Sequence, residues 1–251
     1  MRVPHMLLMT VAALAFALSF FFALGGVGSA VALVPALMAV GVPPITARPV
    51  ALLVNVASLG GATVHNLRSG QLKPGPWWPL IACSLPAAPI GAWISTQIPQ
   101  TILQGAFACF MILSGLVIVR PARQSAKQTA DTCPPAGSAL LGSVSGLISG
   151  MLGVGGGGVI VPALHGMGFR AQQIAMVTAL SVPFSSLTGF LAYTAMGSLS
   201  LETCAVASVA ALGGGILGTR AMHRIDQKRI RMVLALSLMV SGLRILWKLA
   251  G

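Results

Sequence analysis

The chain has 251 residues, of which 56% are hydrophobic and only 7% are charged. A water-soluble domain carries about 25% charged residues, so this composition excludes a soluble fold of this size. The formal net charge of +12 is typical of nucleic-acid-binding proteins. Here, however, the basic residues lie between apolar segments, as the positive-inside rule requires. We therefore expect an integral, polytopic membrane protein with lipid as its solvent and no nucleic-acid partner.

Ten apolar segments are predicted. The first could be cleaved as a signal peptide, but cleavage would destroy the glycine-rich motif at Gly28 described below, so we interpret this segment as a retained helix. The ten segments run over about 6–24, 29–41, 46–66, 77–95, 101–119, 137–151, 157–168, 172–194, 202–219 and 230–247. A full membrane crossing takes about 20 helical residues. Segments 29–41, 137–151 and 157–168 are shorter, so we interpret them as broken helices or as arms of a hairpin that turns at mid-bilayer.

A glycine-rich motif occurs twice in the chain. Gly155–Gly158 precede a Val-Pro-Ala-Leu sequence, and Gly28 precedes the same four residues 127 positions earlier. The same offset pairs Gly41 with Gly168 without a gap. Such constant spacing indicates an internal duplication, which predicts a first repeat at 1–119, a cytoplasmic linker at 120–136 and a second repeat at 137–251.

The two repeats are predicted to be inverted, because each makes a net odd number of crossings. With both termini outside, eleven of the 15 Lys and Arg residues fall on the cytoplasmic side and four on the outer side, in agreement with the positive-inside rule. The predicted fold is therefore an all-α polytopic membrane protein with two inverted repeats of five helical segments each. Some of these segments are short or re-entrant, and both termini are outside.

The doubled glycine motif predicts a site for an anion. The first N–H groups of a helix lack partners and carry partial positive charge, so two short helices from inverted repeats could aim these groups at one point. Glycine lets ligand oxygens approach the amides. The candidate residues are Gly28, Ser29, Gly155, Gly156, Gly157 and Gly158. The alternative is that the glycines only permit close helix packing.

Polar residues of the third segment in each repeat, near the motif in sequence, extend this site. They are Asn55, Ser58, Thr63, Thr178, Ser181, Ser185, Ser186 and Thr188, from which we select Asn55, Ser58, Ser181 and Ser185. Serine and threonine hydroxyls also bond back to their own helix, so Asn55 is the strongest candidate.

Three basic or titratable residues are candidates for anion attraction or proton coupling. Arg48 begins a predicted helix at the outer face and could gather anions, or could be an interfacial arginine with its head in water. His65 and His165 lie near the cytoplasmic ends of apolar segments, where an imidazole could carry a proton; an interfacial role is the alternative for both.

The sequence contains no HExxH, GxSxG or P-loop lysine motif and no Cys/His spacing for a metal. We therefore expect no enzyme activity, no catalytic residues, no metal and no cofactor. A passive anion channel and an accessory membrane subunit without transport of its own remain open alternatives.

The Gly153–Gly158 sequence leading to Pro162, its weaker copy from Gly26 to Pro35, and the chain length resemble the TauE/SafE family of sulfite exporter and sulfonate permease-type membrane proteins. The resemblance covers essentially the whole chain. It implies a secondary transporter of the bacterial inner membrane, an exporter of sulfite, sulfoacetate or a related organosulfonate. By the same resemblance we expect proton coupling and a homodimer.

Overall fold

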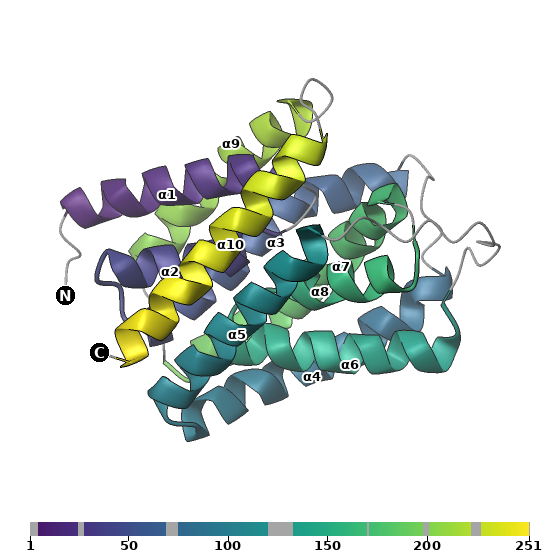
Figure 1. Cartoon of the computed structure of the whole chain (residues 1–251), viewed down its shortest axis with the longest axis horizontal. Coiled ribbons are helices and arrows are strands. Elements are labelled where there is room, and N and C mark those ends of the chain that lie inside the picture. Colours follow the sequence, from purple (N-terminus) through teal and green to yellow (C-terminus); the bar gives the residue numbers. More distant parts are fainter. Residues whose placement is uncertain are drawn as a thin grey trace.

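The structure is a computed structural model, and it describes residues 5–24, 28–68, 75–119, 133–169, 171–197, 201–221 and 227–250. These residues form ten α-helices packed into one elongated bundle (Figure 1). The first half contains α1 (His5–Leu24), α2 (Ala30–Ala39), α3 (Pro44–Arg68), the short 3₁₀ turn η1 (Gly75–Trp77), α4 (Trp78–Gln97) and α5 (Gln100–Val119). The second half contains α6 (Pro135–Leu152), α7 (Gly157–Gly166), α8 (Ala171–Ala195), α9 (Leu201–Ala221) and α10 (Gln227–Ala250).

Five of the described helices are long and apolar enough to cross a membrane, namely α1, α4, α5, α6 and α8. The prediction of an all-α polytopic membrane protein is thereby confirmed. In contrast, α2 and α7 have ten residues each. At about 1.5 Å per residue they span roughly half of a hydrocarbon core that is about 30 Å thick.

One segment differs from its prediction. The segment at 137–151 was expected to be too short to cross, but α6 has 18 residues and is one of the five spanning candidates. The helix starts two residues earlier, at Pro135, because proline at the first helical position has the required φ and needs no hydrogen bond for its missing N–H. Residues 120–132 of the predicted linker lie outside the described residues, and the repeat boundaries stay a prediction.

The two halves make equivalent contacts. In α5, a methyl group built on Gly115 would lie 2.9 Å from the Ala235 carbonyl oxygen of α10. In α10, a methyl group on Gly242 would lie 2.9 Å from the Ala108 carbonyl oxygen of α5. Gly242 lies 127 positions after Gly115, and Ala235 lies 127 positions after Ala108, so the second contact is the first one with the two repeats exchanged. The α1–α9 and α4–α6 pairs show the same exchange. A methyl group on Gly218 of α9 would collide with the Phe20 carbonyl of α1, and one on Gly91 of α4 would collide with the Leu147 carbonyl of α6. A pseudo-twofold axis therefore relates the halves.

The direction of this axis follows from the helices that pack against their own counterparts. α3 and α8 are antiparallel, since Leu52 approaches Gly189 while Thr63 donates a hydrogen bond to the Ala179 carbonyl. α5 and α10 are antiparallel as well. A twofold rotation reverses a helix only when the axis is perpendicular to it, so the halves have opposite orientations along the helix direction. Accordingly, the start of α1 and the end of α10 lie at the same end of the bundle (Figure 1).

The short helices pack inside the bundle as arms of hairpins. α7 ends at a tight turn in which the Phe169 N–H bonds the Leu164 carbonyl at 3.0 Å, and α8 follows. The N-terminal Gly157 of α7 consequently lies beside the middle of α8, 3.1 Å from Thr178 when a methyl group is added. α2 ends in the equivalent turn, from the Val42 N–H to the Leu37 carbonyl at 3.0 Å. We call the segments that precede the two short helices, Gly28–Ser29 before α2 and Gly153–Gly156 before α7, the glycine breaks. Both glycine breaks thus lie deep in the bundle.

Candidate functional site

The N-termini of α2 and α7 meet where the glycine breaks are. A methyl group built on Gly157 would lie 3.8 Å from the Gly28 backbone nitrogen, and one on Gly158 would lie 3.5 Å from the Val31 side chain. These residues are all buried. The structure therefore brings together the two helix starts that sequence analysis placed in one site. Unpartnered N–H groups and the helix dipole make such a position favourable for negative charge.

Gly155 requires glycine for two reasons. Its φ is +69°, a conformation in which other residues are strained. A methyl group there would lie only 2.0 Å from Asn55 Nδ2. Gly153 also has a positive φ, +74°, and ends α6. The chain between α6 and α7 thus makes a turn that depends on glycine and presses against α3.

Asn55 joins the two glycine breaks. Its Oδ1 accepts a hydrogen bond from the Ala30 N–H in the first turn of α2 at 3.2 Å, and its Nδ2 donates to the Val154 carbonyl at 3.3 Å. The side chain is completely buried. One amide therefore satisfies a donor from one repeat and an acceptor from the other, next to the pseudo-twofold axis. The equivalent residue of the second repeat is Val182, so the site is asymmetric.

Two unpartnered hydroxyls border the same region. Ser186 Oγ lies 3.2 Å from the position of a methyl group on Gly155, and Thr178 packs its methyl group against Gly157. Both residues are fully buried, and neither hydroxyl has a hydrogen-bond partner among the described residues. A buried polar group without a partner costs about 1–3 kcal/mol. Such groups are consistent with a ligand that supplies the missing partner.

The three predicted serines of α3 and α8 are occupied within their own helices. Ser58 donates to the Asn55 carbonyl at 3.5 Å, Ser181 to the Val177 carbonyl at 2.9 Å, and Ser185 to the Val182 carbonyl at 3.2 Å. This is the back-bonding alternative that the sequence left open. Their role in binding stays a prediction.

The other predicted motif residues have individual surroundings. Ser29 precedes α2 and pairs its hydroxyl with Ser19 of α1 at 3.1 Å. Gly28 lies against Asn55, and Gly156 faces Ser145 of α6. Gly158 faces the ring of Phe110 in α5. The site is therefore enclosed by α1, α3, α5, α6 and α8.

The charged and titratable candidates lie away from this point. Arg48 is seven residues before Asn55 on α3, about 10 Å along the helix, and its stem packs against Gly153. His165 is half-buried in the last turn of α7, at the opposite end of that helix from Gly157. His65 is in α3, but its side chain lies outside the described residues.

Sequence reasoning named Thr178 and Ser186 among the polar residues near the motif without selecting them, and it missed Ser114. Thr178 and Ser186 carry the unpartnered hydroxyls, and Ser114 of α5 donates to the Gly158 carbonyl at 3.3 Å. The only sequence signal for Ser114 is its place in a Ser-Gly-Leu sequence that recurs at Ser241.

Among the described residues, the single acidic side chain is Glu202, which is exposed, and no His, Cys, Asp or Glu cluster could hold a metal. The described surroundings are therefore free of negative charge.

Comparison with known proteins gives a consistent result. The family described as Sulfite exporter TauE/SafE matches residues 11–245. The chain is 27% identical over 237 residues to a probable membrane transporter protein, y4hK, of Sinorhizobium fredii, covering 92% of this chain and 95% of that protein. It is 24% identical over 249 residues to the probable membrane transporter protein YunE of Bacillus subtilis, covering 89% and 91%. No solved structure matches the chain significantly.

Proposed function

The chain belongs to the TauE/SafE family of multi-pass membrane transporters, and on that premise we propose that it exports a small sulfur-containing anion. Sulfite, sulfoacetate and related organosulfonates are the proposed substrates. The description of the family as sulfite exporters supports this substrate class. The family and its named relatives are transporters and not enzymes, in agreement with the absence of catalytic motifs from the sequence.

The observation that carries the proposal is the meeting of two helix N-termini at Asn55. In this arrangement Asn55 Oδ1 accepts from the Ala30 N–H, as an oxygen of a bound oxyanion would. An arriving anion would replace Asn55 at this N–H. The freed Asn55 amide, the Ser186 hydroxyl and the Thr178 hydroxyl would then add side-chain donors. Backbone dipoles and neutral donors would hold the charge without a basic residue.

The electrostatics of the bundle favour an anion over a cation. A carboxylate near the site would repel the substrate, and the one acidic residue in the described part of the chain, Glu202, is exposed at the start of α9. Inverted repeats with a site at their interface suit alternating access, because rocking one repeat against the other exposes the site to each side in turn. Proton coupling and a homodimer are proposed from family resemblance alone.

Uptake of labelled sulfite, sulfoacetate and sulfate into liposomes containing the purified protein tests the proposal. We expect saturable uptake of sulfite or sulfoacetate, stimulated by a pH gradient, with sulfate transported more slowly. A flux that does not saturate and ignores the pH gradient would indicate a passive channel. Absence of flux for all three anions would contradict the proposed function.

A further inference from the structure

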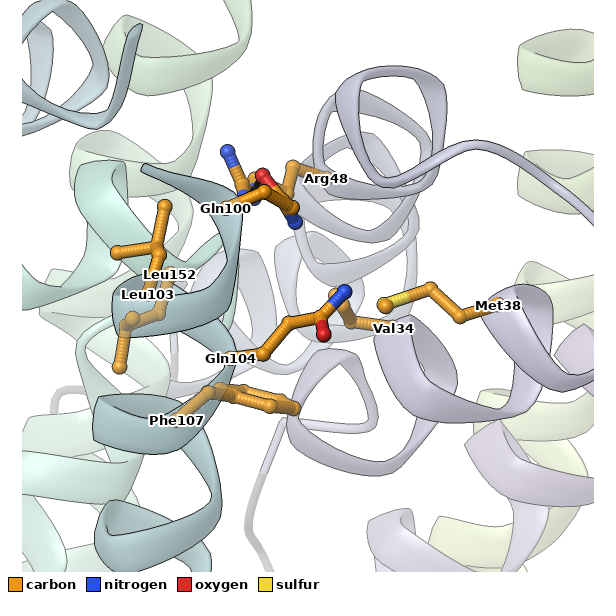
Figure 2. A pocket seen from close by; sticks show the side chains of 8 residues that line it. All are labelled: Val34, Met38, Arg48, Gln100, Leu103, Gln104, Phe107 and Leu152. Atoms are coloured by element: carbon orange, nitrogen blue, oxygen red, sulfur yellow. Dashed lines mark hydrogen bonds between the residues drawn. The ribbon is translucent and has the colours of Figure 1, made fainter. Parts of the chain in front are cut away.

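A small pocket lies between α2, α3, α5 and the end of α6, next to the glycine breaks, and most of its lining is apolar. It is lined by Val34, Met38, Arg48, Gln100, Leu103, Gln104, Phe107 and Leu152. Figure 2 shows Arg48 and Gln100 together at one side of it, with Gln104 opposite Met38 and Val34. The space left free, about 10 Å³ for the centre of a water-sized sphere, is about enough for one water molecule.

Arg48 is a buried cation in this pocket, and no carboxylate of the described residues pairs with it. The residue is 6% exposed, so it is not an arginine that keeps its head in water. Within the described part of the chain, its guanidinium donates to two neutral groups, Ser95 Oγ at 3.5 Å and Gln100 Oε1 at 3.0 Å. The exposed Glu202, the one acid among the described residues, is not bonded to it. A buried charge without a counter-charge is unfavourable, and an anion would correct this.

The pocket adjoins the glycine breaks through the same stretch of chain. Leu152 lines the pocket, and the next residue, Gly153, approaches Arg48 so closely that a methyl group there would lie 2.6 Å from Arg48 Cβ. Two residues later Gly155 presses against Asn55. Arg48 and Asn55 are seven residues apart, which places them on one face of α3. An anion leaving Arg48 along this face would reach the meeting point of α2 and α7.

We propose that Arg48 and Gln104, with Gln100, form an access subsite that receives the oxyanion group of the substrate before it reaches the glycine breaks. This inference rests on the proposed anion transport. Guanidinium groups bind carboxylate and sulfonate-like groups through two parallel hydrogen bonds. The flexible Met38 side chain can move to enlarge the pocket. The equivalent of Arg48 in the second repeat is Ala175, so the subsite serves one end of the transport path only.

Uptake kinetics of Arg48→Gln test the subsite. We expect the KM for sulfite to rise about tenfold, because charge-assisted hydrogen bonds to the anion are lost. The maximal rate should stay within about threefold of the wild-type rate. Arg48→Lys should recover part of the affinity, because it restores the charge but not the fork of donors. The matched control is Arg244→Gln, an exposed arginine of α10 on the same predicted side, which should leave KM unchanged. A wild-type KM in Arg48→Gln would overturn the proposal.

A labelling experiment keeps the test independent of transport and of the stability of Arg48 variants. In a Gln104→Cys variant that keeps Arg48, the new thiol should react faster with a negatively charged methanethiosulfonate reagent, sulfonatoethyl methanethiosulfonate, than with the positively charged trimethylammonioethyl methanethiosulfonate. Peptide mapping separates this site from the native cysteines. Equal rates for the two reagents would overturn the subsite. If wild type transports no anion but the anionic preference holds, the proposed function fails and the anion subsite stands.

Discussion

At the scale of single residues, Asn55 and Ser186 support the proposal that the glycine breaks form a binding site and are more than a packing motif. Asn55 holds the two glycine breaks together through the Ala30 N–H and the Val154 carbonyl. Ser186 directs a hydroxyl without a partner among the described residues toward Gly155. If the glycines only allowed close packing, the unpartnered hydroxyl of Ser186 would not be needed, because an apolar side chain would fill the same space at lower cost.

Ser186→Ala should separate binding from stability. Removal of a buried, unpartnered hydroxyl should leave the free energy of unfolding unchanged or raise it by about 1 kcal/mol. The sulfite uptake rate at low concentration should fall about tenfold, because one donor to the anion is lost. Thermal unfolding in detergent and liposome uptake measure the two effects. Ser84→Ala in α4 is the control, because this serine is also buried but bonds the Ile81 carbonyl of its own helix. Equal uptake in both variants would exclude Ser186 from the site.

Asn55→Val should damage both properties. Valine occupies the equivalent position of the second repeat, Val182, and has a comparable size. The Ala30 N–H and the Val154 carbonyl would each lose a partner, so we expect the free energy of unfolding to fall by about 2 kcal/mol or more. We also expect uptake to be lost. A variant that unfolds earlier but still transports sulfite at the wild-type rate would show that Asn55 is only structural.

At the scale of helices, glycine sets how closely the spanning helices approach. α6 places Gly142, Gly146 and Gly150 along one face, and each lies against the α4 backbone. A methyl group on Gly150 would lie 1.9 Å from the Ala88 carbonyl oxygen. Small residues at such a spacing are typical of close helix packing in membranes. The glycines of α6 therefore have a different role from those of the break that follows.

Gly150→Ala should destabilise the protein by pushing α6 away from α4. We expect a loss of about 1–3 kcal/mol, the usual range for an overpacked interior, measured by thermal unfolding of the purified protein. Gly105→Ala in α5 is the control, because nothing lies within 4 Å of the added methyl group and alanine is the better helix former by up to about 1 kcal/mol. The helix-packing argument would be wrong if the two variants were equally stable.

At the scale of the whole molecule, the internal twofold places the start of α1 and the end of α10 at one end of the bundle (Figure 1). The basic residues predict that this end is outside. Phosphatase fusions, which are active only outside the cytoplasm, should be active at both termini, whereas fluorescent-protein fusions there should be dark. A cytoplasmic C-terminus would contradict the predicted orientation of the inverted repeats.

Much of this architecture was predictable from the sequence, because hydrophobic segment length and a constant offset of 127 positions determine helix number and duplication. The start of α6 was not, since Pro135 has the same appearance in a linker and at the first position of a helix. The sequence also did not predict that Ser186, and not Ser185, has the hydroxyl that faces Gly155. Both are small, polar and adjacent, and only the rotation of α8 against its neighbours decides which hydroxyl bonds its own helix and which faces Gly155.

The central claim is that backbone groups at the glycine breaks bind the transported anion, and uptake by Gly155→Leu tests it most directly. Any side chain at Gly155 collides with Asn55 and is strained at φ +69°. We predict that this variant still inserts into the membrane and purifies as a monodisperse protein, but transports no labelled sulfite into liposomes. Sulfite uptake at the wild-type rate by the inserted variant would contradict the account.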